Sequence, residues 1–325
     1  MEHGIVGRGA RVTAFGLGTA PIGNLFSAIS DEQAGETVEA AWAAGVRYFD
    51  TAPHYGLGLS ERRLGAALRD RPREAYTLST KVGRLLVPFS AGGRDDQGFD
   101  VPAAYRRVWD FSRDGVRRSI DESLERLGHD SLDIVLIHDP DDHWAEAAGE
   151  AYPALAELRD EGVIKAIGVG MNQWELPARF VKETDLDLVM LAGRYTLLDQ
   201  SGAAELLPLC EARGVSVFAA AVFNSGLLAT HDATGTYDYG PAPSDLVERT
   251  RRIAAVCERY DVTLPQAALA FPARHPAVTC VVAGARSAKE VERNAALATT
   301  PVPAALWTAL ADESLIPAPA THPHR

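Results

Sequence analysis

The stretch Tyr48-Phe49-Asp50-Thr51-Ala52-Pro53-His54-Tyr55-Gly56 decides the fold of this 325-residue chain. Its apolar start runs into an aspartate, a proline turn follows, and a tyrosine stands five residues beyond the acid. This pattern is typical of the C-terminal end of a buried strand, where barrel enzymes carry their catalytic groups. We therefore predict a strand that ends at Asp50 and a loop that presents Tyr55 to a pocket.

Two later segments end in the same manner. The apolar segment from Tyr76 to Thr80 runs into Lys81, and the one from Leu132 to Ile137 runs into His138. An acid, a tyrosine, a lysine and a histidine thus follow three successive predicted strands. Because strands bring such ends together only as parallel neighbours, the sequence predicts one pocket that contains all four groups.

Strand and helix patterns alternate along the chain, and they give eight strand–helix units with no linker or composition shift between them. The sequence therefore predicts an α/β fold, a single (β/α)₈ TIM barrel that forms one domain over residues 1–325. We expect N-terminal capping strands and a C-terminal tail that packs outside the barrel. A doubly wound open sheet fits less well, because the polar strand ends are spread over the chain and not gathered at one switch point.

Two long loops are expected at the functional face of the barrel. Residues 84–111 follow the third strand without a clear period, and residues 231–243 follow the seventh. A structureless loop of this length is usually functional or disordered. We expect Trp109 or Phe111, together with Tyr237 or Tyr239, to pack on the apolar face of a substrate ring. The alternative is that these aromatic residues only anchor the loops.

The composition narrows the classes of function. The 32 basic and 44 acidic residues give a net charge of −12, which argues against a nucleic-acid partner. No apolar run approaches the roughly 20 residues that span a bilayer, and the N-terminus lacks a signal-peptide pattern. Cys210, Cys257 and Cys280 stand among apolar neighbours, so we expect buried free thiols and a cytoplasmic location.

The four polar groups are suited to proton transfer. A free tyrosine, with a pKa of about 10, exchanges protons poorly near neutrality. A Lys81 ammonium close to Tyr55 favours the phenolate and lowers that pKa, while Asp50 keeps the ammonium charged and in place. His138 can orient a substrate oxygen and share the proton. Such a set needs no metal ion when an external hydride acceptor is present.

A metal site is a competing interpretation, because residues 138–143 read His-Asp-Pro-Asp-Asp-His. Pro140 interrupts regular geometry there, and no second His/Glu pair stands at helical ligand spacing elsewhere. We therefore predict no metal. The chain also lacks a Walker A lysine motif and a G-x-S-x-G elbow, so phosphoryl and acyl transfer have no supporting motif.

Asp50, Tyr55, Lys81 and His138 resemble the catalytic tetrad of the aldo-keto reductases, a nicotinamide-dependent (β/α)₈ family. Within that family the chain is similar to the branch of L-fucose and D-threo-aldose 1-dehydrogenases, which includes pyridoxal 4-dehydrogenases. The stretches that carry the resemblance are residues 16–20, 49–58, 79–84, 137–140, 168–173, 191–199 and 291–294.

The resemblance implies roles for further residues. The residues expected to bind the cofactor are Gly18, Thr19, Ala20, Asp50, Asn172, Asn224, Ser225, Gly226, Leu228, Gly284, Arg286, Glu290 and Asn294. The residues expected at the substrate are His54, Tyr55, His138, Trp109 and Phe111. Asn172 would hold the nicotinamide, residues 224–228 the pyrophosphate and residues 284–294 the adenosine. Ala192 stands where the family usually has a glutamine, and residues 219–223 lack the usual stacking tyrosine.

The implied activity is oxidation of C1 of a cyclic hemiacetal sugar to its lactone. Pyridoxal oxidation or aldehyde reduction is the alternative, and a non-catalytic nucleotide-sensing subunit is the alternative of another class. We expect NAD to be preferred over NADP, because Glu290 would repel a 2′-phosphate. Arg286 and Lys289 lie close in sequence and could still bind that phosphate. The small-molecule substrate is the only partner expected, and the sequence leaves the oligomeric state open.

Overall fold

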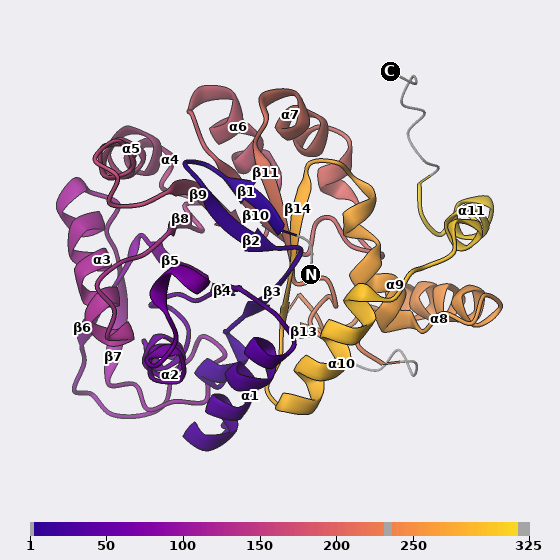
Figure 1. Ribbon diagram of the computed structural model, residues 1–325, viewed down its shortest axis with the longest axis horizontal. Helices are drawn as coiled ribbons and strands as arrows, with labels where there is room; N and C mark the ends of the chain where they lie inside the picture. The colour runs from indigo at the N-terminus through magenta and orange to yellow at the C-terminus, as the bar shows by residue number, and fades with distance from the viewer. Residues whose placement is uncertain (1–2, 231–235, 239, 318–325) are drawn as a thin grey trace.

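The computed structural model describes residues 3–230, 236–238 and 240–317. Within these residues, eight parallel strands close into a barrel, and helices surround it (Figure 1). The barrel strands are β3 (Phe15–Gly18), β4 (Tyr48–Asp50), β5 (Thr77–Val82), β8 (Ile134–His138), β9 (Ala166–Met171), β10 (Leu188–Ala192), β11 (Ser216–Ala220) and β14 (Val278–Gly284). Each strand pairs with the next, and β14 pairs with β3 to complete the barrel. The predicted barrel is confirmed.

The helices begin and end at residues with suitable capping chemistry. The side chains of Ser30 and Ser112 accept hydrogen bonds from the amides of Gln33 and Gly115 at the starts of α1 and α3. The α-helices are α1 (Asp31–Ala43), α2 (Leu59–Leu68), α3 (Arg113–Leu127), α4 (Trp144–Glu146), α5 (Tyr152–Asp160), α6 (Glu175–Glu183), α7 (Leu206–Arg213), α8 (Ser244–Glu258), α9 (Leu264–Ala270), α10 (Ala288–Thr299) and α11 (Ala304–Asp312). A π-helical turn, Ala147–Ala151, joins α4 to α5.

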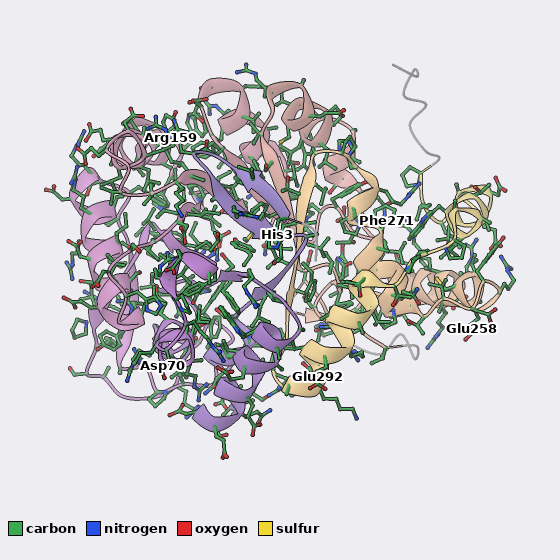
Figure 2. The ribbon with its side chains drawn as sticks, viewed as in Figure 1. His3, Asp70, Arg159, Glu258, Phe271 and Glu292 are labelled. Atoms are coloured by element: carbon green, nitrogen blue, oxygen red, sulfur yellow. The ribbon has the colours of Figure 1, made fainter. Side chains whose placement is uncertain are left out.

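An N-terminal hairpin closes one end of the barrel, as predicted. Its strands are β1 (His3–Val6) and β2 (Ala10–Thr13), and they pair in antiparallel fashion. Val6, Ala10 and Val12 are buried against a cluster that includes Tyr48 and Ile134, the first residues of β4 and β8. The hairpin therefore covers the N-terminal ends of the strands. In projection, His3 lies over the middle of the barrel (Figure 2).

Residues 84–111 are not structureless, so that prediction is wrong. Strands β6 (Arg84–Pro88) and β7 (Tyr105–Trp109) pair in antiparallel fashion, and Arg84 lies opposite Trp109. Leu86 packs with Phe99 and Val101, whereas neighbouring Leu85 is buried outside that cluster. Because adjacent residues of β6 are both buried, the period-two signal of a strand is lost.

The segment after β11 also contains a short hairpin, β12 (Thr236–Tyr237) with β13 (Gly240–Pro241). Of the predicted second loop, residues 231–235 and Tyr239 lie outside the described residues. At the end of the chain, α11 packs on α8 outside the barrel (Figure 1); the rest of the predicted tail, residues 318–325, lies outside the described part.

The three cysteines, Cys210, Cys257 and Cys280, are buried free thiols, as predicted. Among the described residues, no helix combines the length and apolar character that crossing a membrane requires.

Candidate active site

The centre of the candidate site is a buried ion pair. Asp50 is the last residue of β4, and Lys81 stands near the end of the adjacent strand β5. Lys81 Nζ lies 2.6 Å from Asp50 Oδ2 and donates a second hydrogen bond of 2.9 Å to the carbonyl oxygen of Thr51. Ser79 Oγ donates to the other carboxylate oxygen at 2.8 Å. Both charged side chains are only 2–3% exposed, so their partners fix them in position.

Tyr55 and His138 lie beside this pair. Lys81 Nζ is 4.7 Å from the centre of the Tyr55 ring. His138 ends β8, and its ring stands nearly perpendicular to that of Tyr55 at a centroid distance of 6.0 Å. The structure therefore brings together the four residues for which the sequence predicts catalysis. A cation in this place favours the phenolate form of the tyrosine.

Two histidines of the site are neutral at ordinary pH. Burial, together with the nearby Arg84 guanidinium, holds the pKa of His138 well below its ordinary value of 6.5. The same two causes lower the pKa of His54 to about 2. The rings of His54 and His138 are 5.7 Å apart, centre to centre. A neutral imidazole carries one donor and one acceptor, so His138 can both give and take a hydrogen bond with a substrate oxygen.

Arg84 links three parts of the site. Its Nη2 donates to Asp139 Oδ2 at 2.5 Å, and its Nη1 lies 3.2 Å from Nδ1 of His54. The centre of its guanidinium lies 4.4 Å from the centre of the Trp109 ring. Asp139 Oδ2 in turn is 3.5 Å from Nε2 of His138. Neither Arg84 nor Asp139 was predicted from the sequence to have a role in the site.

The two aromatic residues expected at the substrate differ in position. Trp109 is 44% exposed and stacks on Phe111 at a centroid distance of 5.7 Å. Phe111 is 3% exposed, and it lies so close to Gly83 that a Cβ on that glycine would meet the ring at 2.2 Å. Phe111 thus supports Trp109 from behind, and we keep only Trp109 as a candidate for substrate contact. Tyr237 donates its hydroxyl to Asp199 at 3.3 Å, which anchors its loop.

The loop after β11, which was expected at the pyrophosphate, has an unusual backbone conformation. Ala221, Asn224, Ser225 and Gly226 all have positive φ, between 46° and 110°. Such a conformation is found in backbone turns that bind anions. Here the amides of Asn224 and Gly226 donate within the loop, to the carbonyls of Ala221 and Phe223 at 2.8 and 3.0 Å. Leu228 is fully buried, and its amide donates to the carbonyl of Phe223 at 3.0 Å, so the structure does not present this residue to a ligand.

Asn224 is buried at 2% exposure, and its side-chain nitrogen makes only a 3.5 Å hydrogen bond to the carbonyl of Gly193. Its Oδ1 has no hydrogen-bond partner within the described part of the chain. Buried polar oxygens normally have a donor, so this corner fits a ligand that brings one. Ala192 and Ala220 end β10 and β11 beside it. Asn172, which follows β9, lines a surface hollow of ≈ 460 Å³ with Arg194 and Ser201.

The residues expected at the adenosine end gather at the start of α10. Glu290 Oε2 accepts a 2.9 Å hydrogen bond from the amide of Arg286, and Ser287 caps the helix. The Arg286 side chain donates to Ser27. Asn294 is 2% exposed, and its Oδ1 accepts a 3.2 Å hydrogen bond from the Arg293 guanidinium. A Cβ on Gly284 would meet the Pro21 ring at 2.8 Å.

Gly18, Thr19 and Ala20, which were expected at the cofactor, differ in exposure. Thr19 is fully buried, and its hydroxyl contacts the carbonyl of Asp50 and the hydroxyl of Ser60, each at 2.7 Å. Its side chain is therefore occupied by protein groups, while Gly18 and Ala20 are partly exposed. Over the described ranges, no group of three or more potential metal ligands is found.

A buried carboxylate–ammonium pair beside a tyrosine and a neutral histidine, all at the C-terminal ends of barrel strands, defines a class of (β/α)₈ enzymes that move a proton to or from an oxygen. The comparisons with known proteins specify the family. Residues 14–312 match the sequence model of the aldo/keto reductase family. The chain belongs to this family and is an oxidoreductase, and family membership implies a nicotinamide cofactor.

Two relatives agree with the branch that the sequence resembles. The chain is 48% identical over 325 residues to D-threo-aldose 1-dehydrogenase of a Pseudomonas species, and the alignment covers 98% of this chain and 99% of the relative. It is 41% identical over 336 residues to pyridoxal 4-dehydrogenase of Microbacterium luteolum, with 97% and 98% covered. Among solved structures, a holo aldo-keto reductase of Bacillus halodurans has a TM-score of 0.76 at 26% identity, with 97% and 96% covered.

Proposed function

We propose that this enzyme oxidises C1 of an aldopyranose, in its cyclic hemiacetal form, to the corresponding lactone. The observation that carries the proposal is the position of Lys81, 2.6 Å from the Asp50 carboxylate and 4.7 Å from the Tyr55 ring centre. The full-length similarity to a D-threo-aldose 1-dehydrogenase supports an aldose as substrate.

Each of the four residues has one task in this reaction. Tyr55 takes the proton of the C1 hydroxyl as general base, because the neighbouring ammonium stabilises its phenolate. Asp50 holds the Lys81 ammonium, and Ser79 holds Asp50. Neutral His138 orients the C1 oxygen. The bound nicotinamide supplies the hydride acceptor for this oxidation.

The chain fits that cofactor along the ends of β9, β10 and β11. The loop at residues 221–226 has the positive φ values of anion-binding turns, and the unpartnered Asn224 oxygen is suited to an amide donor. Glu290 and Asn294 stand at the expected adenosine end. We propose NAD as the preferred form, because a carboxylate can accept a hydrogen bond from a ribose hydroxyl but repels a phosphate.

A second candidate substrate is pyridoxal, which the 41% identity to a pyridoxal 4-dehydrogenase favours. Pyridoxal closes to a hemiacetal too, so the same four residues can serve it. The test is a panel of free aldoses and pyridoxal with NAD and with NADP, followed by the absorbance of reduced nicotinamide. Turnover of aldoses supports the proposal, whereas turnover of pyridoxal alone contradicts it. Cofactor binding without turnover of any substrate would indicate a nucleotide sensor.

A further inference from the structure

A second pair of charged side chains adjoins the tetrad. Arg84 follows β5 and Asp139 follows β8, so the two neighbouring strands that carry Lys81 and His138 also supply this pair. Nη2 of Arg84 lies 2.5 Å from Asp139 Oδ2, and the side chains are 13% and 26% exposed. The same carboxylate oxygen is 3.5 Å from Nε2 of His138. A charged acceptor therefore stands next to the imidazole that faces the substrate.

This pair is costly for the fold to maintain. Asp139 has φ of +42°, a left-handed conformation that non-glycine residues rarely adopt. Burial raises the pKa of its carboxyl group to about 6, although Arg84 opposes the shift. Nε of Arg84 is buried and has no hydrogen-bond partner among the described residues. A buried ion pair of this kind contributes little net stability, and such strained and perturbed groups gather at functional sites.

Arg84 also contacts His54 and Trp109. Because His54 is neutral, its Nδ1 accepts from the guanidinium at 3.2 Å, and its proton is on Nε2. Trp109 covers the guanidinium and keeps much of its ring exposed. One side of the tetrad thus combines a carboxylate acceptor, an imidazole donor and an apolar ring. This combination suits a polyhydroxylated ring, which has hydroxyl groups on its edge and C–H groups on its face.

We propose that Asp139 and Arg84 bind the hydroxyl group on the carbon next to the reacting one, so that the enzyme selects 2-hydroxy cyclic hemiacetals. The Asp139 carboxylate accepts the hydrogen bond of this hydroxyl, and Arg84 holds the carboxylate. The C1 oxygen lies at His138, and the oxygen on the next carbon is then within reach of Asp139 Oδ2, which is 3.5 Å from Nε2 of His138. This inference rests on the proposed aldose substrate. Pyridoxal has no hydroxyl group on the carbon next to its hemiacetal carbon.

The competing view is that Asp139 only positions His138. The two views differ in how Asp139→Asn acts on substrates with and without the hydroxyl group. We would measure kcat/KM for L-fucose and for its 2-deoxy analogue, in the unmodified enzyme and in the variant. For each enzyme we would take the ratio of kcat/KM for L-fucose to kcat/KM for the 2-deoxy sugar. Comparing this ratio between the variant and the unmodified enzyme removes the intrinsic difference in reactivity between the two sugars. A loss confined to L-fucose identifies a substrate contact.

We expect Asp139→Asn to lower the L-fucose to 2-deoxy ratio roughly 10- to 100-fold, the usual effect of a hydrogen bond to a charged group. Asp142→Asn, an exposed acid in the same loop, is the matched control and should leave the ratio unchanged. If Asp139→Asn does not fold, as its melting curve would show, Arg84→Gln tests the pair from the other side and should lower the same ratio.

Three outcomes are distinguishable. An L-fucose-specific loss supports the inference. Equal losses on both sugars, or no loss on either, overturn the inference, while turnover of the sugars by the unmodified enzyme still supports the proposed function. Turnover of pyridoxal without turnover of either sugar overturns the proposed function itself, and the inference with it.

Discussion

Lys81 and Asp50 form an ion pair of 2.6 Å that is closed off from solvent between two adjacent barrel strands. The pair holds the ammonium group beside Tyr55. Ser79 Oγ, which donates to the Asp50 carboxylate, is itself 2.8 Å from the hydroxyl of Tyr48. Burial, reinforced by the Asp50 charge, raises the pKa of Tyr48 well above its ordinary value, so this phenol remains protonated. The two tyrosines therefore differ in environment: Tyr48 is neutral inside the barrel, whereas Tyr55 lies beside the Lys81 ammonium.

The first prediction concerns the stability that this pair provides. Lys81→Met should lower the free energy of unfolding by about 3–5 kcal/mol, because it leaves the Asp50 carboxylate buried without a counter-charge. The double variant Asp50→Asn/Lys81→Met should recover part of the loss. Lys182→Met is the matched control, since its pair with Glu205 is about half exposed and such pairs are worth about 0–1 kcal/mol. Denaturant unfolding measures all three, and equal losses in single and double variants would refute the idea of an uncompensated charge.

The second prediction concerns acid stability. His54 is protonated in the unfolded chain below its ordinary pKa of 6.5 and stays neutral in the folded protein down to about 2. The unfolded state then binds the extra proton, so the unfolding free energy falls as the pH falls below 6.5. His138 contributes with the same sign. Asp139 acts with the opposite sign as the pH falls through about 6, because its folded carboxyl group binds a proton more readily than the unfolded one.

His54→Gln should therefore reduce the slope of unfolding free energy against pH by about 1.4 kcal/mol per pH unit. Denaturant titrations from pH 6.5 down to about pH 5 measure this slope. His3→Gln, at an exposed position, serves as the control and should not change it. An unchanged slope in His54→Gln would show that His54 is already protonated in the folded protein.

The third prediction concerns Trp109. Trp109→Ala removes the ring that covers Arg84, and we expect KM for the aldose to rise about two- to fivefold, in line with one exposed aromatic contact. Phe89→Ala is a suitable control, because Phe89 is 40% exposed and follows β6, the partner strand of β7 in the same hairpin. A lower melting temperature with unchanged kcat and KM would show that Trp109 only stabilises the loop.

The fourth prediction concerns cofactor choice. The unmodified enzyme should have a higher kcat/KM with NAD than with NADP, and Glu290→Arg should shift this ratio by about tenfold or more toward NADP. Glu290→Gln preserves an acceptor for the Arg286 amide but removes the charge, so it should shift the ratio less. A clear NADP preference in the unmodified enzyme would mean that Arg286 or Lys289 reaches the phosphate.

The fold and the four central residues were accessible from the sequence because each signal is local. Asp50, Lys81 and His138 stand at or near the ends of apolar strands, and parallel strands bring such ends together. The short distances between these three side chains follow from the barrel topology, because their strands are neighbours. The predicted strand ends differ from the observed ones by only a few residues, as expected for boundaries.

Other features depend on contacts that no local pattern encodes. Arg84 and Asp139 are 55 residues apart in the chain, and only the pairing of β5 with β8 makes them neighbours. The hairpin of β6 and β7 was missed because both faces of β6 are buried. Phe111 and Trp109 look equivalent in sequence. Phe111 is buried because Gly83 has no side chain and leaves room for the ring of Phe111 against its backbone.

The most direct test of the account is the turnover of Tyr55→Phe on the aldose that the panel identifies. This change removes one hydroxyl group and keeps the ring that lies beside Lys81 and His138. We predict that kcat falls by about 10²–10⁴-fold, the usual contribution of a general acid–base group, while the dissociation constant of the cofactor stays the same. Turnover equal to that of the unmodified enzyme would contradict the central claim, because Tyr55 would then not be the proton acceptor.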